Sequence, residues 1–435
     1  MITKFGCKNI KAIRDYDKIE IRPVTVIMGE NSSGKSSMLQ ALSLLSVNTI
    51  FGSGGIERIK YNNPFSQFGT NDSFKNKNED VTLFFEIEQD GEKVKVVFTY
   101  KDEENNNEYG YLDEVTFYPK NKKLLIYKLS NIKSSKVYKL ELLMSTPNLQ
   151  DCLDNFTQEN QLIIKSIMNF ANVYVSLDGS LSKVEFKIPD IERQIEEEVK
   201  EVHNKIELFL EKPMLTPLNN LFFSLKQIQH IGKLKEKKET YDYSLDYIGY
   251  FGENYKQRAV SLKNTRFIKG AIRDIFGYEL VVDKRKQELF IEQDKKKLEL
   301  HMFGSSVNST IPLLTQFALN RQAEVKNQYR MTIVEEPELN LHPLSQARFI
   351  ESIIKNIPKK HTTVIETHSD HMINKLASLV NKKVLKPKDI VIYYKKKDSK
   401  FQKIELNRCG RFIGDFPEGF FDATLDDIYE LGIEC

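Results

Sequence analysis

The sequence is poor in cysteine and in long apolar runs. Its 435 residues include four cysteines, and their spacing matches neither a disulfide framework nor a zinc knuckle. No run of about 18 or more apolar residues occurs, which excludes a transmembrane helix. The first residues lack the apolar core of a secretory signal. These absences indicate a cytosolic protein, and we expect no contact with a membrane.

The sequence also has little net charge. The formal charge is +3, from 64 Lys and Arg against 61 Asp and Glu. Nucleic-acid binding would therefore need a local patch rather than a global positive field. Short basic clusters are typical of solvated surfaces, unless several of them share one face after folding. They begin at Lys233, Lys284, Lys295 and Lys395.

The length predicts two or three substructures, and the patterns along the chain indicate where they lie. Apolar runs at residues 20–28, 331–334 and 362–365 predict buried strands, and each is followed by a helical pattern. Residues 80–145 predict an antiparallel meander. Residues 190–212 predict an amphipathic helix, either packed on its own domain or available to a partner. Residues 389–394 and 403–406 predict a terminal hairpin.

One motif defines the class of the protein. Residues 29–36 read GENSSGKS and fit G-x-x-x-x-G-K-[ST] between a predicted strand and a predicted helix. Such a loop directs backbone N–H groups and a helix N-terminus at a phosphate. Lys35 would reach the β- and γ-phosphates of ATP, and the Ser36 hydroxyl would bind Mg²⁺. The expected nucleotide-binding residues of the loop are Gly29, Asn31, Ser32, Ser33, Gly34, Lys35, Ser36 and Ser37.

Two later strands end in polar residues that could complete the site. Glu335 and Glu336 follow the apolar run at 331–334, where an open α/β sheet places its ligands. We assign Glu335 to the Mg²⁺ shell and Glu336 to the attacking water, whereas Glu338 could be only a rim charge. His368 follows the run at 362–365 and could hydrogen-bond a γ-phosphate. A zinc pair with His371 lacks a third ligand.

The order of these motifs resembles a known group of ATPases. About 300 residues separate Lys35 from Glu335, and the order resembles the ABC-type ATPases of the structural-maintenance-of-chromosomes (SMC) and overcoming-lysogeny-defect (OLD) kind. Residues 335–343, EEPELNLHP, look like the E-E-P-E-x-x-L-H-P stretch of the OLD family. Residues 366–369, ETHS, resemble its switch-histidine segment, and residues 4–11 resemble its opening strand.

The resemblance implies an α/β fold: an ABC-ATPase-like P-loop domain with an inserted β-rich and helical region. We assign residues 1–75 and 301–384 to the ATPase domain. Between these two segments we expect a β-rich insertion at 76–189 and a helical insertion at 190–300, and after them a C-terminal hairpin and tail at 385–435. In this class the signature turn of a second subunit closes the nucleotide site, which implies a head-to-tail dimer or a larger homo-oligomer. The turn at 303–309 is either a degenerate match to this signature turn or a plain helix cap. Gln67 is either a lid glutamine that binds the metal or a surface-loop residue. The signature candidates are Ser305, Ser306 and Ser309.

Three functions remain open at this point. The resemblance extends by analogy to ATPase subunits of antiphage systems such as Septu and PARIS, which implies a Mg²⁺-dependent ATPase that controls a separate effector. Residues 385–435 show no paired-acid or His-Asn-His pattern, so we expect that effector, a nuclease, to be a different chain. The second reading is an SMC- or RecF-like ATPase that maintains or repairs DNA directly. The long insertion and the degenerate signature disfavour a transporter motor.

Overall fold

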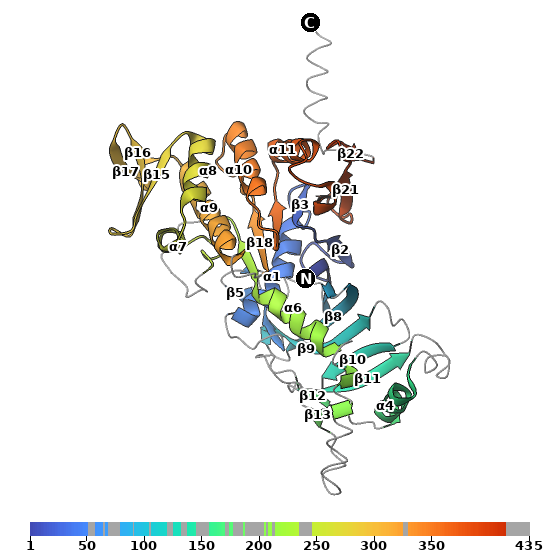
Figure 1. The fold of residues 1–435 in the computed structure, drawn as a ribbon. Helices are drawn as coiled ribbons and strands as arrows, with labels where there is room; N and C mark the ends of the chain where they lie inside the picture. Colours follow the sequence, from blue (N-terminus) through green and yellow to red (C-terminus); the bar gives the residue numbers. More distant parts are fainter. Residues whose placement is uncertain are drawn as a thin grey trace. The chain divides into compact units, whose positions relative to one another are not determined.

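The computed structural model describes most of the chain as two compact units, and Figure 1 labels many of their helices and strands. One unit, here the β-rich unit, comprises Met1–Ile19 and Ser37–Lys226. The other, here the α/β unit, comprises Glu20–Ser36 and Gln227–Cys435. The described residues are 1–50, 57–63, 66–67, 79–89, 91–103, 106–119, 125–131, 137–144, 156–169, 174–176, 186–187, 204–205, 208–210, 214–234, 246–324 and 329–414.

The β-rich unit is built on a ten-stranded sheet in which β4 pairs with β9, beside the path β13-β12-β11-β10-β9-β8-β7-β1-β2. The pairings that join β7 to β13 are all antiparallel, so the predicted meander is confirmed. The strands are β1 (Ile2–Lys8), β2 (Asp17–Glu20), β4 (Arg58–Lys60), β7 (Val81–Gln89), β8 (Glu92–Glu103), β9 (Asn106–Pro119), β10 (Leu125–Asn131), β11 (Val137–Met144), β12 (Tyr174–Ser176) and β13 (Phe186–Lys187).

Aromatic side chains form much of the core of this unit. The rings of Phe5 and Phe85 lie 5.0 Å apart, and Phe98 contacts Phe222 of the helix α6 at 6.4 Å. All four side chains are buried, and aromatic pairs at such separations stabilise a sheet face and the helix that covers it. The remaining elements of the unit are the helices α4 (Gln158–Asn169) and α6 (Thr216–Lys226) and the short strands β5 (Asn62–Asn63) and β6 (Ser66–Gln67).

The α/β unit is built on a seven-stranded sheet with the order β14-β18-β19-β3-β20-β21-β22. The first five strands are parallel, and β21 and β22 continue the sheet antiparallel. Four of the parallel strands are almost wholly buried, because both faces of a parallel sheet are covered. The strands are β3 (Val24–Gly29), β14 (Ile228–Ile231), β18 (Arg330–Glu335), β19 (His361–Glu366), β20 (Ile390–Lys395), β21 (Gln402–Leu406) and β22 (Phe412–Ile413).

Helices follow the strands of this sheet as the predicted α/β pattern requires. The helix α1 begins at Lys35 after β3, α10 follows β18, and α11 follows β19. The side chain of His342 caps α10, and that of Ser369 caps α11. The helix α1 (Lys35–Ile50) has its first two residues in this unit and the rest in the β-rich unit. The other helical elements are α7 (Tyr255–Ser261), α8 (Arg266–Phe276), η2 (Leu300–Met302), α9 (Ser305–Glu324), α10 (Pro343–Lys355), α11 (Asp370–Asn381) and η3 (Pro387–Asp389). A separate antiparallel sheet contains β15 (Glu279–Asp283), β16 (Glu288–Gln293) and β17 (Lys296–Glu299).

Two boundaries predicted from the sequence are wrong. Residues 190–300 were expected to be a helical insertion, but β14 lies in the parallel sheet and β15–β17 form a sheet of their own. The hairpin at 389–406 was expected to be separate from the ATPase domain, but its first strand pairs with β3. Short strands buried on both faces have no periodicity that separates them from buried helix segments. Most of the predicted helix 190–212 lies outside the described residues.

Among the described residues, no helix is both long and apolar enough to cross a bilayer.

Candidate active site

The loop between β3 and α1 has the backbone geometry that a phosphate-binding loop requires. Gly29 and Gly34 adopt positive φ angles of 136° and 105°, and Ser32 adopts 60°. A Cβ atom on Gly29 would lie 2.1 Å from the carbonyl oxygen of Lys395 at the end of β20, so only glycine fits there. The neighbouring strand thus fixes the start of the loop.

Lys35 lies folded over the loop. Its Nζ donates hydrogen bonds to the carbonyl oxygens of Gly29 at 3.0 Å and Glu30 at 2.6 Å. Burial lowers the pKa of Lys35, and the nearby carboxylates of Glu366 and Glu336 act in the opposite direction. The ammonium group therefore lies beside the loop, near the carboxylates of Glu366 and Glu336. Its contact with the β- and γ-phosphates stays a prediction.

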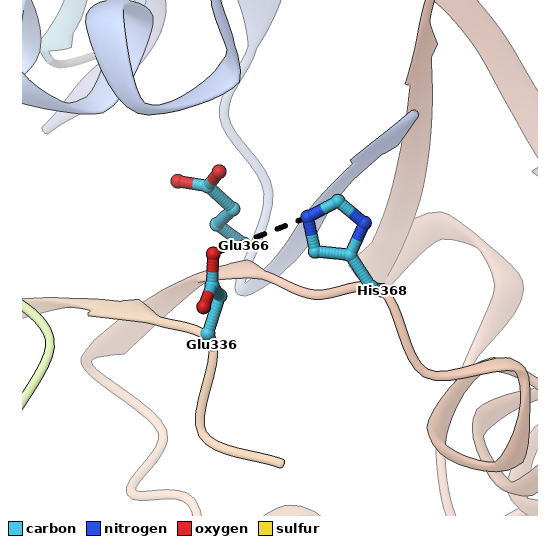
Figure 2. A group of neighbouring side chains, drawn as sticks. All are labelled: Glu336, Glu366 and His368. Carbon is cyan, nitrogen blue, oxygen red and sulfur yellow. Dashed lines mark ion pairs between the residues drawn. The ribbon is translucent and has the colours of Figure 1, made fainter. Parts of the chain in front are cut away.

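Glu336 lies at the first position after β18 in a strained backbone conformation. Its φ angle is 45°, which is uncommon for a residue with a side chain and is typical of functional sites. Its backbone N–H donates to the carbonyl oxygen of Glu366 at 2.8 Å. Its Oε1 lies 2.8 Å from Nζ of Lys233 and 4.0 Å from Nε2 of His368, the pair marked in Figure 2. The side chain therefore has two cationic or protonatable neighbours.

Glu366 lies at the end of β19, directly beside the loop. Its Oε1 accepts a hydrogen bond of 2.8 Å from the Ser36 hydroxyl. The residue is 2% exposed, and its Oε2 has no hydrogen-bond partner among the residues that the structure describes. Burial, together with the negative charge of Glu335, raises the pKa of Glu366 to about 7. Sequence reasoning did not single out this residue, although it stands at a strand end like Glu335.

His368 is held in place by an acid that the sequence left as a possible rim charge. The backbone N–H of His368 donates to Oε1 of Glu338 at 2.6 Å. Glu338 is buried, which raises its pKa, so it is not a rim residue. Burial and then the charge of Lys35 lower the pKa of His368. Glu338 therefore couples the loop after β18 to the loop after β19.

Glu335 is hydrogen-bonded to the adjacent strand β14. Its Oε1 lies 2.9 Å from Nε2 of His230 on β14, and the Tyr250 hydroxyl donates to the same oxygen at 3.5 Å. The side chains of Glu335 and His230 are 5% and 3% exposed. The sequence assigned Glu335 to the metal, whereas the structure shows it in a buried pair on the adjacent strand and shows Glu366 beside Ser36.

The signature candidates lie at the start of α9. Ser305 is exposed there, whereas Ser306 and Ser309 are half-buried. Ser309 donates from its hydroxyl to the carbonyl oxygen of Leu339 at 3.4 Å. This contact connects the turn to the segment that follows Glu336, within the α/β unit.

Other predicted residues have simpler outcomes. Asn31 and Ser32 are exposed at the tip of the loop, and Ser33 is buried with an unpartnered hydroxyl. Ser37 lies in the first turn of α1. Gln67 belongs to β6, but its side chain lies outside the described residues, so its role stays a prediction.

The donor set fits a hard divalent cation. One ligand atom each from Glu336, Glu366 and His368 lie within 4.8 Å of one another, and Figure 2 shows the three side chains together. Two carboxylates beside a serine hydroxyl match the oxygen preference of Mg²⁺, and the unpartnered Oε2 of Glu366 is a buried acceptor available to a cation. The loop and Lys35 likewise fit a nucleotide phosphate.

A glycine-containing loop on β3, a helix that begins at its lysine, and acids at the ends of the next two strands define a P-loop nucleotide-binding fold. The chain belongs to the family described as AAA ATPase domain, whose model matches residues 1–373. The prediction of a P-loop ATPase fold is thereby confirmed.

Solved structures similar to the chain include heads of SMC proteins. The SMC head domain from Thermotoga maritima is 13% identical, with a TM-score of 0.39, and the match covers 93% of this chain and 99% of that one. An Smc head with an extended coiled coil, bound to the C-terminal domain of ScpA from Pyrococcus furiosus, is 11% identical with a TM-score of 0.36 and 99% coverage of both chains. No curated protein matches the chain.

Proposed function

We propose that the protein binds ATP with Mg²⁺ at the loop of residues 29–36 and hydrolyses it there. The proposal is carried by the position of Ser36, in the first turn of α1, beside three residues at or just after the ends of adjacent parallel strands: Glu336, Glu366 and His368. Bound Mg²⁺ would supply positive charge at the phosphates. Lys35 and the loop N–H groups would bind the phosphates, and Glu336 would accept the proton of the attacking water.

The proposal is tested with the full-length protein. Release of inorganic phosphate from ATP should require Mg²⁺ and stop when EDTA is added, while a fluorescent ATP analogue reports binding separately. A protein that binds no nucleotide under either condition would contradict the proposal.

We further propose that nucleotide drives self-association. A single loop surrounds only part of a γ-phosphate, and the exposed start of α9 offers hydroxyl groups and a helix N-terminus to the site of a second copy. The hydrogen bond from Ser309 to the carbonyl oxygen of Leu339 would couple the start of α9 to the segment that follows Glu336, so a change at the nucleotide would alter this surface. The site would then be completed only when two copies are joined head to tail.

Sedimentation of the Glu336→Gln variant tests this association, because slow turnover preserves the ATP state. ATP should convert it from monomer to dimer, and adding Ser305→Arg at the exposed turn should prevent the conversion. A monomer with and without ATP would contradict the proposal.

We also propose that the ATP state controls a separate effector, most simply a nuclease, in antiphage defence. The support is the resemblance of residues 335–343 and 366–369 to OLD-type ATPases, together with a β-rich unit that supplies none of Glu336, Glu366 and His368. A ligand shifts a conformational equilibrium only through its differential affinity, so the ATP and ADP states must present different surfaces to a partner. Co-purification with the product of the neighbouring gene, with ATP and with ADP, is the direct test.

Direct action on DNA is the second candidate. Its support is the SMC-like order of the motifs, but the basic clusters near β15–β17 are balanced: residues 279–299 contain six basic and six acidic side chains. Such a surface gives little net attraction for phosphates. Tight DNA binding at physiological salt, with no protein partner, would favour this candidate over effector control.

A further inference from the structure

We propose that Glu366, rather than Glu335, is the carboxylate that holds the divalent cation beside Ser36. This assignment rests on the proposed function and specifies which strand supplies the metal ligand. The two residues pair in register at the ends of β18 and β19, so strand position alone does not distinguish them.

The first argument is the orientation of the two carboxylates. Oε1 of Glu366 contacts the Ser36 hydroxyl at 2.8 Å, the group that a phosphate-binding loop uses for its metal. Oε1 of Glu335 instead lies 2.9 Å from His230 and accepts from Tyr250 at 3.5 Å. Moving Glu335 to a metal would leave the buried polar groups of His230 and Tyr250 without this acceptor, which is unfavourable.

The second argument is an unpartnered polar atom. Glu366 is 98% buried, yet its Oε2 has no hydrogen bond to any described residue. A buried carboxylate oxygen without a partner is rare in proteins, and such atoms indicate a site for an ion or another ligand. One ligand atom each from Glu336, Glu366 and His368 lie within 4.8 Å of one another.

The third argument is the chemistry of the donors. The carboxylate of Glu366 and the hydroxyl of Ser36 are hard oxygen ligands that favour Mg²⁺ or Mn²⁺, and the imidazole of His368 is compatible with Mn²⁺. The described cluster contains no thiolate, so a soft metal is disfavoured. Glu335 would act indirectly, by fixing β14 against β18 through His230.

Binding of Mn²⁺ to the full-length protein with ATP, followed by electron paramagnetic resonance, tests the assignment. Glu366→Gln should weaken the Mn²⁺ affinity at least about tenfold, and Glu366→Asp should weaken it less. Both variants should bind a fluorescent ATP analogue in EDTA as the wild type does. Glu335→Gln is the matched control and should keep the Mn²⁺ affinity within about threefold.

The outcomes separate the two proposals. A wild-type protein that binds no nucleotide overturns the proposed function and this assignment with it. If the wild type binds Mn²⁺ with ATP, but Glu335→Gln loses the metal while Glu366→Gln and Glu366→Asp keep it, the assignment alone is overturned. Unchanged melting transitions exclude misfolding, and the Glu366→Asp variant retains the charge if Glu366→Gln fails to fold.

Discussion

The ends of β18 and β19 are neighbours in one sheet and both carry a buried glutamate, but the two glutamates have different surroundings. Glu335 is paired with His230 on the next strand, whereas Glu366 contacts Ser36 of the phosphate-binding loop, and its second oxygen has no partner in the described part of the chain. The difference shows that the element packed beside a strand end, rather than the strand end itself, determines what a carboxylate can do.

The two glutamates also differ in the role that a buried carboxylate can have. A buried acid whose hydrogen bonds are made stabilises the packing of the strands around it, while one with an unmade bond is available to a ligand.

The largest effect on ATP affinity is expected at Lys35, which lies over the phosphate-binding loop beside Glu366. Lys35→Ala removes the ammonium group that lies over the loop and should weaken ATP binding at least about 100-fold, because charge-assisted hydrogen bonds to phosphate are lost. Isothermal titration with ATP and Mg²⁺ measures the change. Lys382→Ala, at an exposed residue after α11, is the control and should bind normally. Equal binding by the two variants would contradict the role of Lys35.

The buried pair of Glu335 and His230 is tested by removing the histidine. His230→Ala leaves the buried carboxylate of Glu335 without its main partner and should lower the free energy of unfolding by about 3 kcal/mol. Glu366→Gln should change it by less than about 1 kcal/mol, because the amide oxygen can still accept from Ser36. Urea unfolding of both variants measures the contrast. A similar loss of stability in the two would remove the distinction between the strand ends.

The opposite end of β19 predicts a dependence of stability on pH. Burial, and then the charge of Arg330, lowers the pKa of His361 to about 3, while the Asn320 amide and the Phe317 ring also face it. The folded protein keeps this imidazole neutral, whereas the unfolded chain takes up a proton below about pH 6.5. Stability should therefore fall as the pH falls from 6.5 towards 3, by about 1.4 kcal/mol per pH unit from this group.

Unfolding at pH 7 and pH 5 measures this contribution in the wild type and in His361→Gln. The variant should lose about 2 kcal/mol less than the wild type over this interval. Identical pH slopes in the two proteins would show that His361 does not titrate as the buried site requires.

The smallest effect is expected at Lys233, the partner of Glu336. Lys233 is half-exposed, and ion pairs of this kind contribute little more than about 1 kcal/mol. Lys233→Ala should therefore lower kcat less than about fivefold and leave ATP affinity unchanged. Steady-state kinetics at low and high salt measure this, and a loss comparable to that of a catalytic residue would make Lys233 part of the chemistry.

The sequence predicted the parts of the site that local patterns encode. The G-x-x-x-x-G-K-[ST] motif, the buried runs before Glu335 and His368, and the antiparallel region at 80–145 are all found where they were expected. Each depends on residues close together in the chain, so spacing and periodicity were sufficient to identify them.

The parts that the sequence did not predict depend on contacts between distant segments. His230 and Lys233 follow from the pairing of β14 with β18, about 100 residues later in the chain. The place of Glu366 in the site follows from its hydrogen bond with the Ser36 hydroxyl. The place of Glu338 follows from the hydrogen bond that it accepts from the backbone of His368. The sequence offered little signal for them, because Gln229 and His230 interrupt the apolar residues before Gly232, and Glu366 directly follows the 362–365 run.

The most direct test of the central claim, that the ends of β18 and β19 form an ATP-hydrolysing site with the loop, is single-turnover hydrolysis by Glu336→Gln. The amide cannot accept the proton of the attacking water, so the rate should fall by about 10²- to 10⁴-fold while Mg²⁺-dependent ATP binding stays at the wild-type level. Wild-type turnover in this variant would contradict the account.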